Sequence, residues 1–147
     1  MVLILMTEKP NNFSFDDIQI GQKESFSKKI SESLLDEFSK FSGDYNPLHM
    51  SDDFAKSSKF GKRIVHGMLL ASFFSQLIGM WLPGKNALYF SQTLNFRLPC
   101  YIGDEIKVKG IVIDKSDSTR IISISTSIFN NSDICLIDGT AKVLCSR

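Results

Sequence analysis

The 147-residue sequence predicts a single α+β domain, in which a long antiparallel β-sheet curls around a buried α-helix. Three observations lead to this fold class. Residues 67–82 are the most apolar stretch of helical length, residues 24–30 alternate as a β-strand does, and four longer alternating stretches follow the helix. Because strands joined by short polar turns pair as hairpins, the late strands indicate an antiparallel sheet around the helix.

Residues 1–12 are predicted as an N-terminal tail, and residues 13–147 as the domain. Residues 1–6 are apolar but much shorter than a membrane span, and they lack the basic start and cleavage site of a secretory signal. We therefore expect a frayed terminus or an edge strand there, and no membrane association. Pro10 and its polar neighbours indicate a loop that leads into the domain.

The first strand is predicted at residues 24–30, with Phe26 and Ile30 on its inner face. Ser31 is a suitable N-cap for a short amphipathic helix that ends at Gly43. The aromatic side chains of this helix, Phe38 and Phe41, are expected to pack in the core. The helix leads into the polar segment that carries the candidate catalytic residues.

That segment places Asp44 and His49 five residues apart. Pro47 fixes its own φ angle and moves Asn46 out of the helical region, so the segment is predicted as a turn and not as a regular helix. A rigid turn can aim two titratable side chains at one point. Proton transfer requires such an arrangement, because the acid or base must lie within about 3 Å of the atom it serves.

Two polar segments follow His49. Ser51 with Asp52 and Asp53 resembles a capped helical turn, whose acids lie near the positive end of the helix dipole. These acids and His49 could together bind a metal ion, but capping explains them without one, and we expect no metal. Residues 57–63 are predicted as a solvated loop in preference to a phosphate-binding one. The loop carries three basic side chains, Lys59, Lys62 and Arg63.

The stretch 67–82 is nearly apolar all round, which predicts a helix enclosed by other structure and ended by Pro83 and Gly84. Its length of about 24 Å is too short to cross a bilayer comfortably. Small residues that permit close approach by a sheet or a substrate recur along it, namely Ala71, Ser72, Ser75 and Gly79. The strands that follow are predicted at residues 87–97, 105–114, 120–129 and 134–144.

Composition excludes several classes of function. The 17 Lys and Arg residues are balanced by 16 Asp and Glu residues dispersed along the chain, so nucleic acid is not an expected partner. The three cysteines form neither a disulfide framework nor a zinc pattern, and they indicate reduced thiols in a cytoplasmic protein. Phosphate-loop and Gly-x-Ser-x-Gly motifs are missing, so nucleotide hydrolysis, dinucleotide redox chemistry and serine hydrolysis have no support.

Four motifs together carry a family resemblance. They are F-S-G-D-Y-N-P-L-H at residues 41–49, H-G-M-L at 66–69, L-P-G-K at 82–85 and L-P-C-Y-I-G-D-E at 98–105. In these motifs the chain resembles the (R)-specific enoyl-CoA hydratases (hydratase 2) of fatty acid metabolism, the MaoC-like family with the hot-dog fold. The resemblance extends from about residue 18 to residue 143, and the hot-dog fold it implies is the curled sheet around a helix predicted above.

The site can be described in part from chemistry alone. Hydration of an activated double bond needs a base for the water, an acid for the adjacent carbon and donors for the enolate oxygen. Asp44 and His49 can supply the first two, and backbone N–H groups at the helix start near Gly67 can supply the third. The resemblance implies the same roles. It further implies that Asn46 and Ser75 are supporting polar residues around the catalytic pair.

His66 precedes the apolar helix directly, and its predicted role is structural, at the helix start or on a backbone carbonyl. The resemblance implies a trans-2-enoyl thioester of coenzyme A as substrate, an (R)-3-hydroxyacyl thioester as product, no dissociable cofactor and a homodimer. Two alternatives stay open beside this hydro-lyase. One is a 3-hydroxyacyl-[acyl-carrier-protein] dehydratase, and the other is a non-catalytic protein that binds acyl-CoA; a thioesterase is disfavoured by the D-x-N-P-x-H run.

Overall fold

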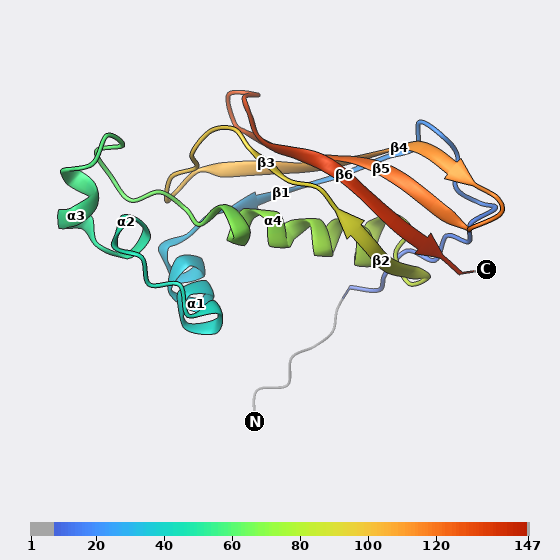
Figure 1. Ribbon diagram of the computed structural model, residues 1–147, viewed down its shortest axis with the longest axis horizontal. Helices are drawn as coiled ribbons and strands as arrows, with labels where there is room; N and C mark the ends of the chain where they lie inside the picture. The colour runs from blue at the N-terminus through green and yellow to red at the C-terminus, as the bar shows by residue number, and fades with distance from the viewer. Residues whose placement is uncertain (1–7, 147) are drawn as a thin grey trace.

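A computed structural model describes residues 8–146 of the chain, and the apolar residues 1–6 lie outside the described residues. A six-stranded antiparallel sheet curls over one long helix, while three short helices gather at one end of the sheet (Figure 1). The strands are β1 (Lys23–Lys29), β2 (Ala87–Gln92), β3 (Asn95–Phe96), β4 (Glu105–Ser116), β5 (Ile121–Asn130) and β6 (Cys135–Cys145). The helices are α1 (Glu32–Ser42), α2 (Pro47–Met50), α3 (Asp52–Lys56) and α4 (Gly67–Gln76), which a π-helical turn, η1 (Leu77–Trp81), continues. The predicted α+β fold with the hot-dog arrangement is confirmed.

The strands lie in the order β1-β4-β5-β6-β2, and β3 pairs with β6 beside β2. The prediction of one unbroken strand at residues 87–97 was wrong, because the chain leaves the ladder between β2 and β3. The register against β6 also shifts between Tyr89 and Ser91, as in a β-bulge. At the break the backbone of Thr93 crosses Gly139 so closely that a Cβ there would lie 1.8 Å from the Thr93 carbonyl oxygen. Only glycine permits this crossing.

The predicted central helix is present, and it buries one side against the concave face of the sheet. Its first half packs on a core cluster that includes Leu70, Phe74 and Ile137, and η1 packs on a second cluster around Ile78. The N–H of Leu82 donates to the carbonyl of Leu77 over 2.8 Å, which is the wider π-helical spacing. The helix therefore ends one residue before Leu82, and Pro83 follows.

The expectation that this helix is enclosed all round was wrong. Four residues at helical spacing form an exposed stripe, Met68, Ser72, Ser75 and Gly79. A single sheet covers only the side of a helix that faces it, and within residues 8–146 no other element covers the opposite side. Within the same residues, no helix combines the length and the apolar composition needed to span a bilayer.

Helix α1 is capped as predicted. The Oγ atom of Ser31 accepts the N–H of Leu34 over 3.4 Å, and Gly43 ends the helix in the left-handed region with φ 80°. The expectation that Phe41 packs in the core was wrong, because its side chain is 87% exposed. The buried stripe of α1 passes through Ser39, and a residue two positions later points to roughly the opposite side of the helix.

The predicted boundary between tail and domain, at residues 12 and 13, stays a prediction. The N–H of Asn11 donates to the carbonyl of Met80 over 2.9 Å, and its side-chain amide donates to the carbonyl of Trp81 over 2.9 Å. Asn12 pairs with Gly84 in an isolated β-bridge. These two residues of the predicted tail therefore lie against the end of the central helix.

Candidate active site

The segment that carries Asp44 is held by a chain of local hydrogen bonds. The N–H of Asp44 donates to Ser42 Oγ over 3.1 Å, and Asp44 Oδ1 accepts the N–H of Asn46 over 3.1 Å. Asn46 Oδ1 in turn accepts the N–H of Leu48 over 3.0 Å and so caps α2. The predicted turn therefore covers only residues 44–46. His49 lies within the helical turn α2, because proline is well tolerated at the first position of a helix.

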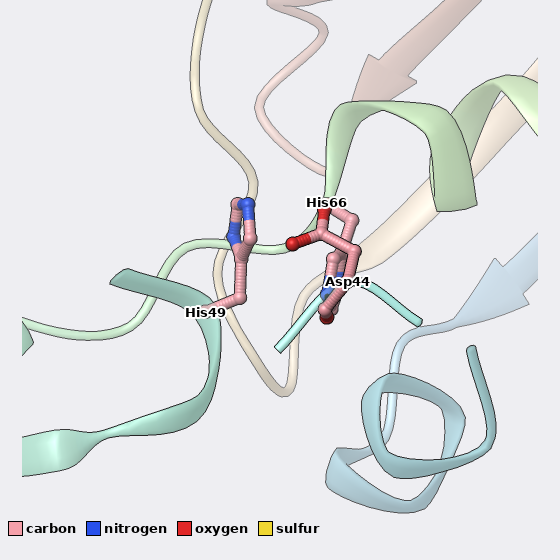
Figure 2. Close-up of side chains that lie close together, drawn as sticks. All are labelled: Asp44, His49 and His66. Atoms are coloured by element: carbon pink, nitrogen blue, oxygen red, sulfur yellow. Dashed lines mark hydrogen bonds between the residues drawn. The ribbon is translucent and has the colours of Figure 1, made fainter. Parts of the chain in front are cut away.

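His49 is oriented by a backbone carbonyl from the segment that leads to α4. Its Nδ1–H donates to the carbonyl oxygen of Ile64 over 2.8 Å. A carbonyl can only accept, so Nδ1 carries the proton, and Nε2 of the neutral imidazole is an acceptor. Figure 2 shows a carboxylate oxygen of Asp44 directed toward the His49 ring. The two predicted catalytic side chains thus face the same space.

His66 is the third polar side chain of the cluster, beside Asp44 and His49. It is buried, its ring stacks on that of His49 with centroids 4.1 Å apart, and its Nε2 lies 3.1 Å from the carbonyl oxygen of Asp44. Burial lowers the pKa of His66, although the Asp44 carbonyl opposes this shift. The predicted contact with a backbone carbonyl is confirmed, whereas His66 makes no side-chain cap on α4.

The start of α4 offers donors to the same space. Among the described residues, no acceptor partners the backbone N–H groups of Gly67 and Met68, the first two of the helix. The helix dipole adds partial positive charge at this end. A Cβ on Gly67 would lie 2.7 Å from ring carbons of Phe96, so glycine lets α4 and β3 approach closely.

These groups open onto one cavity of about 640 Å³ between α4, α2 and the segment from β3 to residue 100. Asp44, His49 and His66 form its polar end. Two cations, Lys59 and Arg97, also line it. The remaining lining residues are mostly apolar, including Phe60, Val65, Met68, Leu70, Phe96, Leu98 and Ile137. An apolar cavity with a few convergent polar groups suits a substrate with an apolar body and one reactive polar centre.

The other predicted site residues do not line this cavity. Asn46 lies next to it, where its side chain caps α2. Ser75 lies on the exposed stripe of α4, more than two turns from Gly67. The structure thus gathers Asp44, His49 and Gly67 around the cavity, while Ser75 stands apart from them. The supporting roles of Asn46 and Ser75 remain predictions.

Arg63 is a residue whose role the sequence did not indicate. It was predicted in a solvated loop, but its side chain is 6% exposed. Its Nε–H donates to the carbonyl of His49 over 2.5 Å, and Nη1 donates to Glu32 Oε1 over 2.8 Å. Arg63 therefore joins the start of α1 to α2. The sequence could not indicate the contact between Arg63 and the His49 carbonyl, because every residue has a main-chain carbonyl and the two residues are fourteen positions apart.

The predicted capping role of Ser51 is confirmed, since its Oγ accepts the N–H of Phe54 over 3.2 Å. Asp52, one of the two acids that could bind a metal ion together with His49, has a side chain that is 86% exposed, and its Oδ1 lies 3.9 Å from Arg63 Nη1. Within residues 8–146, the group spaced for a metal ion is instead Asp44, His49 and His66, with ligand atoms within 4.8 Å of one another. The stacked imidazoles present faces to each other, and His66 Nε2 is occupied by the Asp44 carbonyl, so this set fits a metal ion poorly.

A curled antiparallel sheet around one helix is the hot-dog arrangement, and here a carboxylate and an imidazole lie beside the start of that helix. The chain belongs to the MaoC-like dehydratase family, because residues 17–130 match the model described as MaoC like domain. It is 38% identical to the (R)-specific enoyl-CoA hydratase of Aeromonas caviae over 130 residues, which cover 88% of this chain and 97% of that protein.

Two further relatives extend this comparison. The mitochondrial 3-hydroxyacyl-[acyl-carrier-protein] dehydratase of Arabidopsis thaliana is 35% identical, over 86% of this chain and 77% of that protein. The unliganded structure of R-hydratase PhaJ1 from Pseudomonas aeruginosa superposes with a TM-score of 0.89 at 33% identity, over 94% of this chain and 88% of that one. Both similarities span nearly the whole described domain.

Proposed function

We propose that the chain is an (R)-specific enoyl-CoA hydratase, a hydro-lyase that reversibly adds water to trans-2-enoyl-CoA and yields (R)-3-hydroxyacyl-CoA. One observation carries the proposal. The Asp44 carboxylate and the acceptor Nε2 of His49 face the same apolar cavity that the free N–H groups at the start of α4 adjoin. The 38% identity to an (R)-specific enoyl-CoA hydratase supports it.

The proposed reaction follows from what each group can donate or accept. A water molecule between Asp44 and His49 gives one hydrogen to each acceptor, and its oxygen attacks C3 of the enoyl thioester as a proton leaves it. The electron pair of the double bond moves toward the thioester carbonyl, whose oxygen is stabilised by the N–H groups of Gly67 and Met68. The acid formed on the Asp44–His49 pair then returns the proton to C2, so that atoms and charge balance.

Both bonds form from one side of the substrate in this proposal, because the pair lies on one wall of the cavity. Addition is therefore syn. The thioester itself acidifies C2, so the chemistry requires no dissociable cofactor and no metal ion. The poor fit of the Asp44, His49 and His66 cluster to a metal ion supports a metal-free reaction.

Crotonyl-CoA is the substrate for the direct test, followed by loss of its enoyl absorbance. Turnover that disappears in Asp44→Asn supports the proposal. A folded wild-type protein that binds crotonyl-CoA without turnover would contradict it and favour the non-catalytic alternative.

The second candidate is a 3-hydroxyacyl-[acyl-carrier-protein] dehydratase, favoured by the Arabidopsis relative and by Lys59 and Arg97 at the cavity. Lys59 could approach an acidic carrier protein or the phosphates of coenzyme A, whereas the Arg97 guanidinium already donates two hydrogen bonds to Asp138. Assaying crotonyl-CoA and crotonyl-carrier protein on one preparation separates the two. A kcat/KM at least tenfold higher on the carrier protein would favour the dehydratase.

The proposed assembly is a homodimer. Strand β2 is an edge strand, and its exposed apolar residues Leu88 and Phe90 support pairing with a second copy. Light scattering coupled to gel filtration tests this assembly. A cytoplasmic location is also proposed, supported by three free thiols, of which Cys100 and Cys145 are buried.

A further inference from the structure

His66 contacts both members of the proposed catalytic pair. Its Nε2 lies 3.1 Å from the carbonyl oxygen of Asp44 and 3.1 Å from Ser39 Oγ. Its ring stacks on His49 and lies 4.9 Å from the ring of Phe38. The side chain is 1% exposed, so these contacts fix it on every side.

The proton of His66 can be assigned from these partners. The Asp44 carbonyl only accepts, and Ser39 Oγ uses its own hydrogen toward Met50 Sδ at 2.9 Å. Nε2 must therefore carry a hydrogen, which the carbonyl and the hydroxyl share. His66 Nδ1 is buried and has no hydrogen-bond partner among the described residues. A neutral His66 ring is consistent with the missing partner of Nδ1, because a proton on Nδ1 would be a buried donor without an acceptor.

We infer that His66 is a positioning residue, which as its neutral Nε2–H tautomer holds the Asp44 main chain and the His49 ring in the geometry for proton transfer. The inference rests on the proposed function. One side chain restrains both partners: a hydrogen bond fixes the backbone that carries the Asp44 carboxylate, and ring stacking fixes the plane of His49. Displacement of a catalytic group by about 1 Å can cost a hundredfold in rate.

The charges that face His66 favour its neutral form. From α2 it meets His49, from the preceding loop Asp44, and from the segment before α4 the Arg63 guanidinium. Burial lowers the pKa of His66, and the neighbouring His49 and Arg63 act in the same direction, while Asp44 opposes them. Two charged imidazoles stacked at 4.1 Å would repel each other, so a neutral His66 leaves His49 free to accept the proton.

Two amide variants separate positioning from a merely structural role. His66→Gln places an N–H at the depth of Nε2, whereas His66→Asn carries the same amide one bond too short to reach the Asp44 carbonyl. The matched pair is assayed with crotonyl-CoA, and the unfolding temperature of each variant is measured. We expect His66→Asn to lose about tenfold to a hundredfold in kcat with KM within about threefold, and His66→Gln to keep most of kcat. Equal kcat values for the two variants, or a change confined to KM, would overturn the inference.

A spectroscopic measurement makes the test independent of turnover. The chain contains two histidines, so long-range ¹H–¹⁵N spectra of the imidazoles contain two ring systems, and His66→Gln identifies each. Wild-type spectra at pH 7 are expected to show His66 as the Nε2–H tautomer and His49 as the Nδ1–H tautomer. In His66→Asn the His49 ring signals are expected to shift and broaden, because stacking no longer holds the ring plane.

The spectra also distinguish failure of this inference from failure of the proposed function. A wild-type His66 that is charged at pH 7, or protonated at Nδ1, overturns the inference whether or not the variants fold. Unchanged His49 signals in folded His66→Asn do the same. If the expected tautomers are found but crotonyl-CoA and crotonyl-carrier protein are both left unhydrated, the proposed function fails and the positioning of the pair stands.

Discussion

The imidazole rings of His49 and His66 stack with their centroids 4.1 Å apart and their planes 30° apart, although seventeen positions separate the two residues in the chain. His49 lies in the helical turn α2 and His66 at the start of α4. The contact therefore joins the segment that carries the candidate acid–base pair to the helix whose N–H groups face the same cavity. A substitution at His66 is therefore expected to change the orientation of the His49 ring, and a substitution at His49 that of the His66 ring.

Removal of either member of the pair is expected to lower kcat by about a hundredfold or more, the scale of acid–base catalysis. Asp44→Asn removes the basic carboxylate and His49→Ala removes the imidazole, and KM is expected to change little in both variants. The double variant is expected to be little worse than either single one, because groups that hold one water act as a unit. Steady-state kinetics with crotonyl-CoA give kcat and KM for each variant. Near-normal turnover by folded Asp44→Asn would contradict the proposed mechanism.

A side chain at Gly67 is expected to lower activity on short and long acyl chains alike. In Gly67→Ala the new Cβ would lie 2.7 Å from the Phe96 ring, next to the N–H groups proposed for the thioester carbonyl. Gly79→Ala on the same helix is the control, since among the described residues a Cβ there would meet no atom within 4 Å outside the helix's own backbone. The measurement is kcat/KM for crotonyl-CoA and for a long-chain enoyl-CoA. Loss on the long substrate alone would move Gly67 to the acyl-tail pocket.

Arg63→Met is expected to lower the free energy of unfolding by about 1.5–3 kcal/mol, the range for a lost hydrogen bond to a charged group. The variant leaves the carbonyl of His49 without the guanidinium and releases Glu32 at the start of α1. Lys62→Met is the matched control, because within residues 8–146 the exposed Lys62 makes a single side-chain interaction, a cation–π contact with Tyr101 that is worth about 1 kcal/mol or less. Urea unfolding of the two variants gives the comparison, and equal losses would contradict the structural role of Arg63.

Stability is expected to fall on acidification, in part because of His66. Its pKa in the folded chain is lowered by burial below the ordinary value of 6.5. At pH values between the two pKa values the unfolded chain binds more protons, so the free energy of unfolding rises with pH there. The contribution is fully present above pH 6.5 and is lost as the pH falls toward the lowered value. Denaturation of wild type and His66→Gln at pH 7.5 and 5.5 tests this, and an identical acid dependence in both would count against it.

The hydrated product is expected to be the (R) enantiomer. The pair on one cavity wall predicts syn addition, and the choice of face follows from the similarity to (R)-specific hydratases. Coupling the reaction to an (S)-specific 3-hydroxyacyl-CoA dehydrogenase provides the measurement. Little NADH is expected to form, and rapid NADH formation would contradict the assignment even if hydration were confirmed.

Local sequence rules determined much of this protein. The cap at Ser31 and the left-handed stop at Gly43 each follow from residues within one turn, whereas the helical turn α2 after Pro47 was not predicted. Strand alternation likewise predicted β4, β5 and β6 to within about two residues, because an inner face and an outer face repeat with a period of two. The family motifs predicted Asp44, His49 and Gly67 as site residues, and the three line one cavity.

Only the tertiary structure decided how those residues are held. His49 bonds to the carbonyl of Ile64, His66 to that of Asp44 and Arg63 to that of His49. Every residue has such a carbonyl, so no residue type or spacing marks the partner. The exposed stripe of α4 and the break between β2 and β3 were missed for a related reason. The burial of a helix face and the register of a strand depend on which surfaces the folded sheet brings together. Those surfaces come from segments that are distant in the chain, so the local sequence does not reveal them.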